Sequence, residues 1–260
     1  MLLQGVLMRK QKIFLVTVLL VLSSIVSALD LQPVIDRVHR DGLYDMYLRK
    51  LSTTSTRVVS YGELKHIVAK EGFHVVVVGG YSGLGYQDPE TLTKLLRTMV
   101  DRIGDNTLYV LGATSDGIGI GYTVIPARAK ENGFHNVRMA GIVSRNAAEW
   151  GIAPQDYVVF VDTDPYTWDV IEDGKSLYIG IAAETGHGKV IYFRGGETSG
   201  HEIQEACEKG VETYLVITKG TEPNSENVRK KKAKNPDYIT DGTIQFVKDQ
   251  ERYPSLTILR

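Results

Sequence analysis

Four consecutive valines, Val75 to Val78, constrain the fold of this chain more than any other feature. An unbroken apolar run of this length is typical of a strand that is buried on both faces, as the strands of parallel sheets are. A glycine-rich turn, Gly79 to Gly85, follows, and Asp88-Pro89-Glu90 then begins a helix with proline near its first position. The sequence therefore predicts a strand, a glycine turn and a helix that ends near Ile103.

The same alternation continues along the chain. Further strands are expected at 107–111, 137–143, 157–161, 177–181, 190–193 and 212–217, and further helices at 31–50, at 60–69, up to about 132 and at 200–209. Strands that alternate with helices form parallel sheets with right-handed crossovers. We therefore expect an α/β fold, a Rossmann-like, doubly wound, mostly parallel sheet with helices on both faces.

Length and composition suit one full-sized domain with additions at both ends. The chain has 260 residues, of which 43% are apolar, which is enough for a substantial core. We expect a signal peptide at 1–28, a helical segment at 29–70, the Rossmann-like nucleotide-binding domain at 71–218 and a polar, basic extension at 219–260.

The N-terminus predicts export. A basic stretch, Met8 to Lys12, precedes an apolar run, Ile13 to Leu22, and the small residues Val26-Ser27-Ala28 form a cleavage site. The competing interpretation is an uncleaved membrane anchor, because the apolar stretch up to Ala28 is close to the length of a membrane span. We expect a secreted or periplasmic protein, which contacts a membrane only if this segment is not cleaved.

The charge balance gives no reason to expect a nucleic-acid partner. The formal net charge is −1, so the chain as a whole does not attract nucleic acid. One basic run, residues 229–234, is the exception. No aromatic residues are interleaved with it, so we expect a solvated helix or tail rather than a patch that binds nucleic acid or a membrane.

Glycine-rich turns follow three of the expected strands, at 79–85, 115–121 and 194–200. In open parallel sheets ligands bind at the carboxyl ends of strands, where glycines let backbone N–H groups approach a phosphate. The first turn has the spacing found in short-chain dehydrogenases. The Tyr-x-x-x-Lys of that family should follow the turn, but the match here, Tyr61 to Lys65, precedes it. Hydride transfer is therefore the poorer fit.

A second family fits the order of the turns better. The chain carries an Asp-Pro-Glu helix start after the first turn, then GATSDGIGIGYTVIPARAKENG around the second turn, then GGETSGHE at 195–202. This order resembles the Lonely Guy superfamily, formerly annotated in part as lysine decarboxylases, over about residues 74–217. Its members include cytokinin riboside 5′-monophosphate phosphoribohydrolases, and its signature is PGGxGTxxE. Gly195, Gly196 and Glu202 match that signature. Ser199 stands in place of its threonine, Thr198 in place of its third glycine and Arg194 in place of its proline.

The resemblance implies a phosphate site at the third turn. Backbone N–H groups of residues 196–199 would face a phosphate at the start of a helix, helped by the helix dipole. Glu202, one helical turn later, would hold ribose hydroxyls or stabilise the positive charge that develops on the sugar during N-glycosidic cleavage. Glu202 is thus the catalytic candidate. The expected ligand-binding residues are Gly195, Gly196, Thr198 and Ser199, with Gly80, Ser82, Gly117 and Gly119 on the opposite side of the cleft. The alternative is a simple helix cap, in which Thr198 or Ser199 is the N-cap and Glu202 completes a capping box.

One departure from the family bears on catalysis. Catalytic members pair the glutamate with an arginine in an M-x-x-R-K stretch shortly before the signature. Here the corresponding stretch is VDTDPYTWDV, and the aligned position falls near Thr167. Without that cation, a bound phosphate loses a charge-assisted contact. Arg145 and Arg194 are the candidates to replace it.

We expect no metal and no other cofactor. His187 and His201 lack the further clustered ligands of a zinc site. Asp162, Asp164 and Asp169 alternate with proline and aromatic residues as loop residues do, so a cation site there is not expected.

Three functions remain open. We favour a protein that binds a nucleotide or nucleotide-derived ligand. The alternatives are an active nucleoside 5′-monophosphate phosphoribohydrolase and a non-enzymatic ligand sensor or interaction module. The resemblance also implies a homodimer.

Overall fold

The structure is a computed structural model that describes residues 32–52, 54–146, 152–163 and 170–260. The chain divides into two compact units, residues 1–43 and 44–260. Helix α2 (Gln32–Leu51) begins in the first unit and ends in the second. The expected signal peptide, 1–28, lies outside the described residues. In the described part of the chain, no helix combines the length and apolar character that a membrane span requires.

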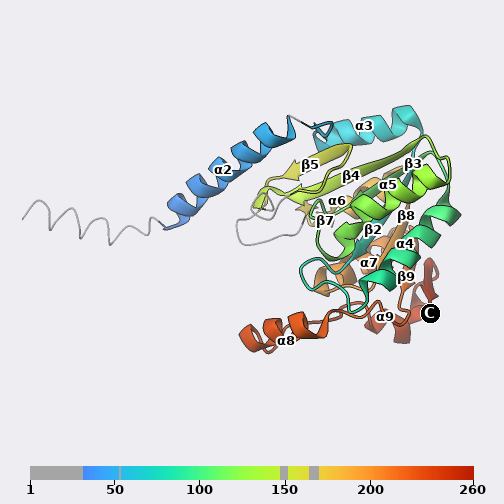
Figure 1. Cartoon of the computed structure of the whole chain (residues 1–260). Helices are drawn as coiled ribbons and strands as arrows, with labels where there is room; N and C mark the ends of the chain where they lie inside the picture. The colour runs from blue at the N-terminus through green and yellow to red at the C-terminus, as the bar shows by residue number, and fades with distance from the viewer. Residues whose placement is uncertain (1–31, 53, 147–151, 164–169) are drawn as a thin grey trace, which may run out of the picture. The chain divides into compact units, whose positions relative to one another are not determined.

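A parallel sheet forms the centre of the second unit (Figure 1). Within the described residues it has eight strands, and every neighbouring pair is parallel. In spatial order the strands are β1 (Arg57–Val58), β5 (Tyr157–Val161), β4 (Val137–Ser144), β3 (Thr107–Leu111), β2 (His74–Gly80), β8 (Lys189–Phe193), β9 (Glu212–Val216) and β10 (Leu256–Leu259). A separate short hairpin joins β6 (Ile171–Glu172) to β7 (Lys175–Ser176).

Helices cover both faces of this sheet, which confirms the expected doubly wound α/β fold. Helices α4 (Pro89–Ile103) and α5 (Gly121–Glu131) pack on one face. On the other face lie α3 (Tyr61–Glu71), α6 (Leu177–Glu184), α7 (Glu197–Glu208) and the short α9 (Gln245–Lys248). Val76 and Val78 contact the first layer, whereas Val75 and Val77 contact the second. The four valines are at most 2% exposed, as the sequence predicts.

The order of the strands places a crossover point between β2 and β8. From β2 the chain continues outward through β3, β4 and β5, and it then returns to add β8 on the other side of β2. The register sets Gly79 beside Tyr192 and Gly80 beside Phe193. The first and third glycine turns therefore leave neighbouring strands at the same edge of the sheet. In open α/β sheets this is the position at which ligands bind.

Three segments differ from the sequence-based expectation. Arg57–Val58, within the segment expected to be helical, is strand β1 of the sheet. Residues 177–181, expected as a strand, are the first turns of α6, with Leu177, Ile179 and Ile181 buried. The expectation was wrong because an apolar run this short is equally compatible with a buried helix. The basic extension ends in β10, which pairs with β9, so residues 256–259 are part of the sheet. Earlier in the extension, α8 (Ser225–Lys234) is a solvated helix without a buried residue, as expected.

Candidate functional site

A pocket of about 220 Å³ opens at the carboxyl ends of β2 and β8. The first glycine turn contributes Gly80 and Ser82 to its wall, and α7 contributes Thr198, Ser199 and Glu202. The two groups are more than a hundred positions apart in sequence, and all five residues were expected at the site. The fold brings them together because β2 and β8 are neighbours in the sheet.

The other four expected residues do not line this pocket. Gly117 adopts a φ of +53°, and a Cβ on it would lie 2.0 Å from the Tyr81 carbonyl oxygen. A Cβ on Gly119 would lie 2.0 Å from the Thr114 carbonyl oxygen. These two glycines allow close backbone packing of the second turn. A ligand contact by them, or by Gly195 and Gly196, remains a prediction.

The start of α7 differs from a simple cap. Its N-cap residue is Gly196, which has no side chain with which to cap the helix. The Gly200 N–H donates to the Gly196 carbonyl (3.1 Å), so Thr198 and Ser199 belong to the first turn. N–H groups of a first turn have no partner inside their own helix, and the helix dipole places partial positive charge there. This arrangement is the one in which helix N-termini bind phosphate.

Glu202 is held by hydroxyl donors from two other elements. The Tyr192 hydroxyl at the end of β8 donates to Oε2 (2.5 Å), and the Ser176 hydroxyl donates to Oε1 (3.2 Å). Because the N-cap is Gly196, Glu202 lies beyond the third helical position that a capping-box acid occupies. Burial, and secondarily the charge of Glu202, raises the pKa of Tyr192 and of Tyr178 well above the usual range for tyrosine. Both phenols consequently stay protonated and able to donate at neutral pH.

The described lining of the pocket includes a carboxylate but no lysine or arginine. Arg194, one candidate to replace the family arginine, donates instead to Asp241 (3.2 Å) and Glu222 (3.4 Å). Arg145, the other candidate, pairs with Asp162 (3.3 Å) and lies 4.7 Å from the ring centre of Tyr44. Neither arginine lines the pocket. Thr167, at the aligned position, lies outside the described residues, as do Asp164 and Asp169.

The C-terminal extension fastens the third glycine turn, a role that the sequence did not reveal. Arg194 has a φ of +52°, which is strained for a residue with a side chain. Its guanidinium, with a side chain only 15% exposed, contacts Asp241 and Glu222 of the extension. The Gly242 N–H also donates to the Gly195 carbonyl (3.0 Å). The sequence pattern of the extension is only polar and basic, so it did not predict these contacts. They form when the extension folds against the third glycine turn.

A second pocket of about 530 Å³ adjoins the first and shares Thr198 and Glu202 with it. Its other walls come from the β6–β7 hairpin and the outer face of α7, including Lys175, Ser176 and Glu205. The Ser176 N–H donates to the Glu205 carboxylate (2.9 Å), which ties the hairpin to α7. Glu202 thus stands at the junction of two hollows.

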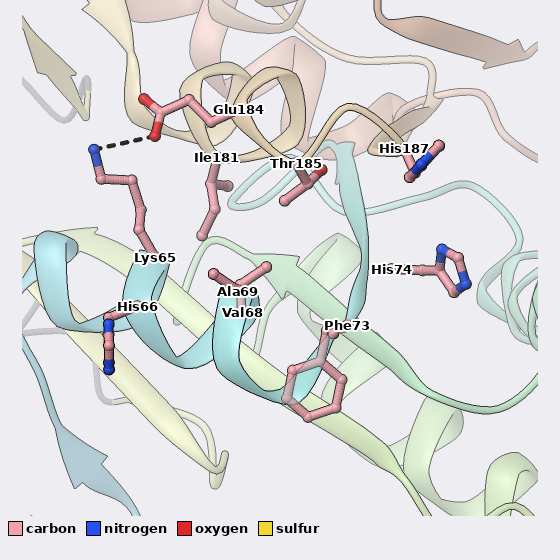
Figure 2. Close-up of a pocket in the computed structure, with 11 residues that line it drawn as sticks. Lys65, His66, Val68, Ala69, Phe73, His74, Ile181, Glu184, Thr185 and His187 are labelled. Atoms are coloured by element: carbon pink, nitrogen blue, oxygen red, sulfur yellow. Dashed lines mark ion pairs between the residues drawn. The ribbon is translucent and has the colours of Figure 1, made fainter.

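A third hollow, of about 550 Å³, lies at the opposite, amino-terminal end of the strands (Figure 2). Its floor includes Val68, Phe73 and Ile181. Figure 2 shows Lys65 reaching toward Glu184, with which it forms an ion pair of 3.1 Å. Both side chains of this pair are more than a third exposed. Among the described residues, no three histidine, cysteine or acidic side chains are grouped to hold a metal ion. Because ligands of open α/β sheets bind at the carboxyl ends, we place the candidate site at the crossover.

Comparison with known proteins adds one structural likeness. No protein-family model matches the chain, and no curated protein matches it by sequence. Among solved structures, the chain is similar to the molybdenum cofactor carrier protein MCP from Chlamydomonas reinhardtii. The two share 14% sequence identity, the match covers 69% of this chain and 99% of that one, and the TM-score is 0.38. A likeness of this size carries no argument about activity, so the assignment to the Rossmann-like α/β class rests on the topology of the sheet.

Proposed function

We propose that this protein binds a nucleotide or nucleotide-derived ligand at the crossover between β2 and β8. The observation that carries the proposal is the joint lining of one pocket by Gly80 and Ser82 on one side and by Thr198, Ser199 and Glu202 on the other. Hydroxyls and N–H groups at the start of a helix favour a phosphate. A fixed carboxylate beside them favours sugar hydroxyls. The resemblance to the Lonely Guy superfamily supports the same ligand class.

The size of the pocket indicates which parts of a nucleotide would lie in it and which would lie in the adjoining hollow. Pockets for drug-sized ligands usually measure about 300–1,000 Å³. The hollow of about 220 Å³ is smaller, so we expect it to take only the phosphate and sugar. The base then extends past Glu202 into the adjoining hollow of about 530 Å³. Since no cation lines the described part of the first pocket, Glu202 and a phosphate repel each other. We expect dissociation constants between micromolar and millimolar.

Calorimetric titration of a panel of nucleoside 5′-monophosphates tests the proposal. Thr198→Glu adds a negative charge at the proposed phosphate position, on an exposed side chain of the first turn of α7. Thr98→Glu makes the same change on an exposed threonine of α4, away from the pocket. Wild type and Thr98→Glu should bind alike, and Thr198→Glu should bind at least about tenfold more weakly. Equal binding by all three proteins, or none by the wild type, would refute the proposed site.

Hydrolysis of the same ligand is the second candidate, favoured by the position of Glu202. Its carboxylate is fixed by Tyr192 and Ser176 against the place where the sugar would lie. A carboxylate there can stabilise an oxocarbenium-like sugar during N-glycosidic cleavage. Release of free base from a nucleoside monophosphate measures this activity. Slow release that Glu202→Gln abolishes would support hydrolysis. Rapid release that the substitution leaves unchanged would show that the reacting centre is elsewhere.

Export and dimerisation are further parts of the proposal. Cleavage after Ala28 would give a mature chain beginning near Leu29, which N-terminal sequencing of the exported protein would detect. Recovery of residues 1–12 would instead support the membrane-anchored form. Sedimentation of the purified protein measures whether it is the homodimer that the family resemblance implies.

A further inference from the structure

Helix α8 concentrates positive charge on an element that has no fully buried residue and that packs on the core through Val228. Five of its ten residues are basic and exposed, namely Arg229, Lys230, Lys231, Lys232 and Lys234. Its acidic residue, Glu226, pairs with Lys230 at 2.7 Å, but both side chains are more than 60% exposed. Such a solvated pair neutralises little. The helix is thus a cationic surface in a chain whose net charge is −1.

The base of α8 is fixed to the edge of the sheet that carries the candidate site. The Asn224 N–H donates to the Gly85 carbonyl (3.2 Å), and the Asn227 amide donates to the Leu84 carbonyl (3.0 Å). The Ser225 N–H donates to the Gln87 side chain (3.0 Å). Figure 1 shows the rest of the helix extending away from the sheet. These bonds hold the basic residues at a defined place, which a disordered tail would not do.

We propose that α8 is a docking surface for an anionic phospholipid bilayer. Clusters of four to eight lysine and arginine residues on a helix bind the negative surface of such bilayers electrostatically. The following segment adds apolar contact groups, because Ile239 is 45% exposed and Ile244 is 44% exposed. Exposed apolar side chains that follow a basic helix in the chain can add apolar contact to its electrostatic attraction for a bilayer.

The composition of α8 favours a bilayer over nucleic acid. Four of its five basic residues are lysines, which act as point charges, whereas arginine forks are the better ligands for individual phosphates. No aromatic residue lies in 225–235 to stack on bases. Because α8 begins beside the first glycine turn, docking would bring the carboxyl edge of the sheet close to the bilayer surface.

Vesicle co-sedimentation of the full chain tests this surface. One set of vesicles contains phosphatidylcholine alone, and the other contains phosphatidylcholine and phosphatidylglycerol in roughly equal parts. The neutral vesicles measure any binding by the apolar N-terminal stretch. We expect strong preference for the anionic vesicles, and loss of that preference in about 1 M salt, where charges are screened within a few ångströms.

Two matched triple variants assign the effect to α8. Lys231→Glu, Lys232→Glu and Lys234→Glu together should weaken binding to anionic vesicles by about a hundredfold or more. The variant should fold normally because α8 buries no residue. The control carries Lys70→Glu, Lys94→Glu and Lys130→Glu, which make the same charge change at exposed lysines of α3, α4 and α5. Equal loss in both variants, equal wild-type binding to both kinds of vesicle, or binding to duplex DNA without binding to anionic vesicles would overturn the proposal.

Discussion

Two buried tyrosines on opposite faces of the sheet differ in what their hydroxyls contact. Tyr192 donates to Glu202, whereas the Tyr109 hydroxyl is buried without a hydrogen-bond partner among the described residues. Removing a buried bond to a charged acceptor costs about 1.5–3 kcal/mol, and removing an unpaired hydroxyl costs little. We expect Tyr192→Phe to lower the free energy of unfolding by about that amount, and Tyr109→Phe to change it by less than about 0.5 kcal/mol. Urea unfolding measures both. A larger loss for Tyr109→Phe would contradict the assigned contacts.

The ion pair of Arg194 and Asp241 gives a second prediction at the scale of single residues. Both side chains are about 15% exposed. Asp241→Asn leaves the partly buried guanidinium with one carboxylate partner, the more exposed Glu222, besides its neutral acceptors Thr221 and the Ile217 carbonyl. We expect a loss of about 1–3 kcal/mol in the free energy of unfolding. The control is Asp249→Asn, whose partner Arg252 is 74% exposed and 4.0 Å away, and it should cost less than about 0.5 kcal/mol. Similar losses in the two variants would show that Arg194 does not fasten the third turn.

At the scale of elements, the glycine pair before α7 combines a constrained and an open position. Gly195 has a φ of +152°, and a Cβ there would lie 2.2 Å from the Ser199 hydroxyl, whereas a Cβ on Gly196 would contact nothing within 4 Å. We expect Gly195→Ala to destabilise the protein by about 1–3 kcal/mol and to displace Ser199. Gly196→Ala should cost less than about 1 kcal/mol, the usual effect of alanine at an N-cap. Thermal unfolding of the two variants checks this order, and the reverse order would contradict the described turn.

The sequence predicted the elements of the sheet better than it predicted their contacts. Val75 to Val78 identified a strand buried on both faces, and the helix expected at 60–69 is α3, which begins with a capping box of Ser60 and Glu63. Both signals are local. The partners of Glu202 come from β7 and β8, and those of Arg194 include the C-terminal extension. A local sequence pattern does not predict contacts between such distant segments. Helix α6 was not predicted, because only packing distinguishes a short buried helix from a buried strand.

At the scale of the whole molecule, buried tyrosines make stability depend on alkaline pH. Burial raises the pKa of Tyr86, Tyr109, Tyr122 and Tyr192 above the ordinary value. A raised folded pKa contributes stability that is fully present below the unfolded value of about 10 and is lost as pH rises toward the folded value. We expect phenolate absorbance of these residues to appear together with unfolding above about pH 10. Gradual ionisation in a folded protein below that pH would contradict their burial.

The site itself depends on the whole fold, because its two halves meet only where β8 returns beside β2. Amide chemical shifts recorded while a nucleoside 5′-monophosphate is added test this claim most directly. The account predicts that the signals of Ser82 and of residues 197–202 shift with ligand, while those of His74 and His187 at the opposite end of the sheet stay in place. Shifts confined to His74, His187 and their neighbours would contradict it and would place the ligand in the amino-terminal hollow instead.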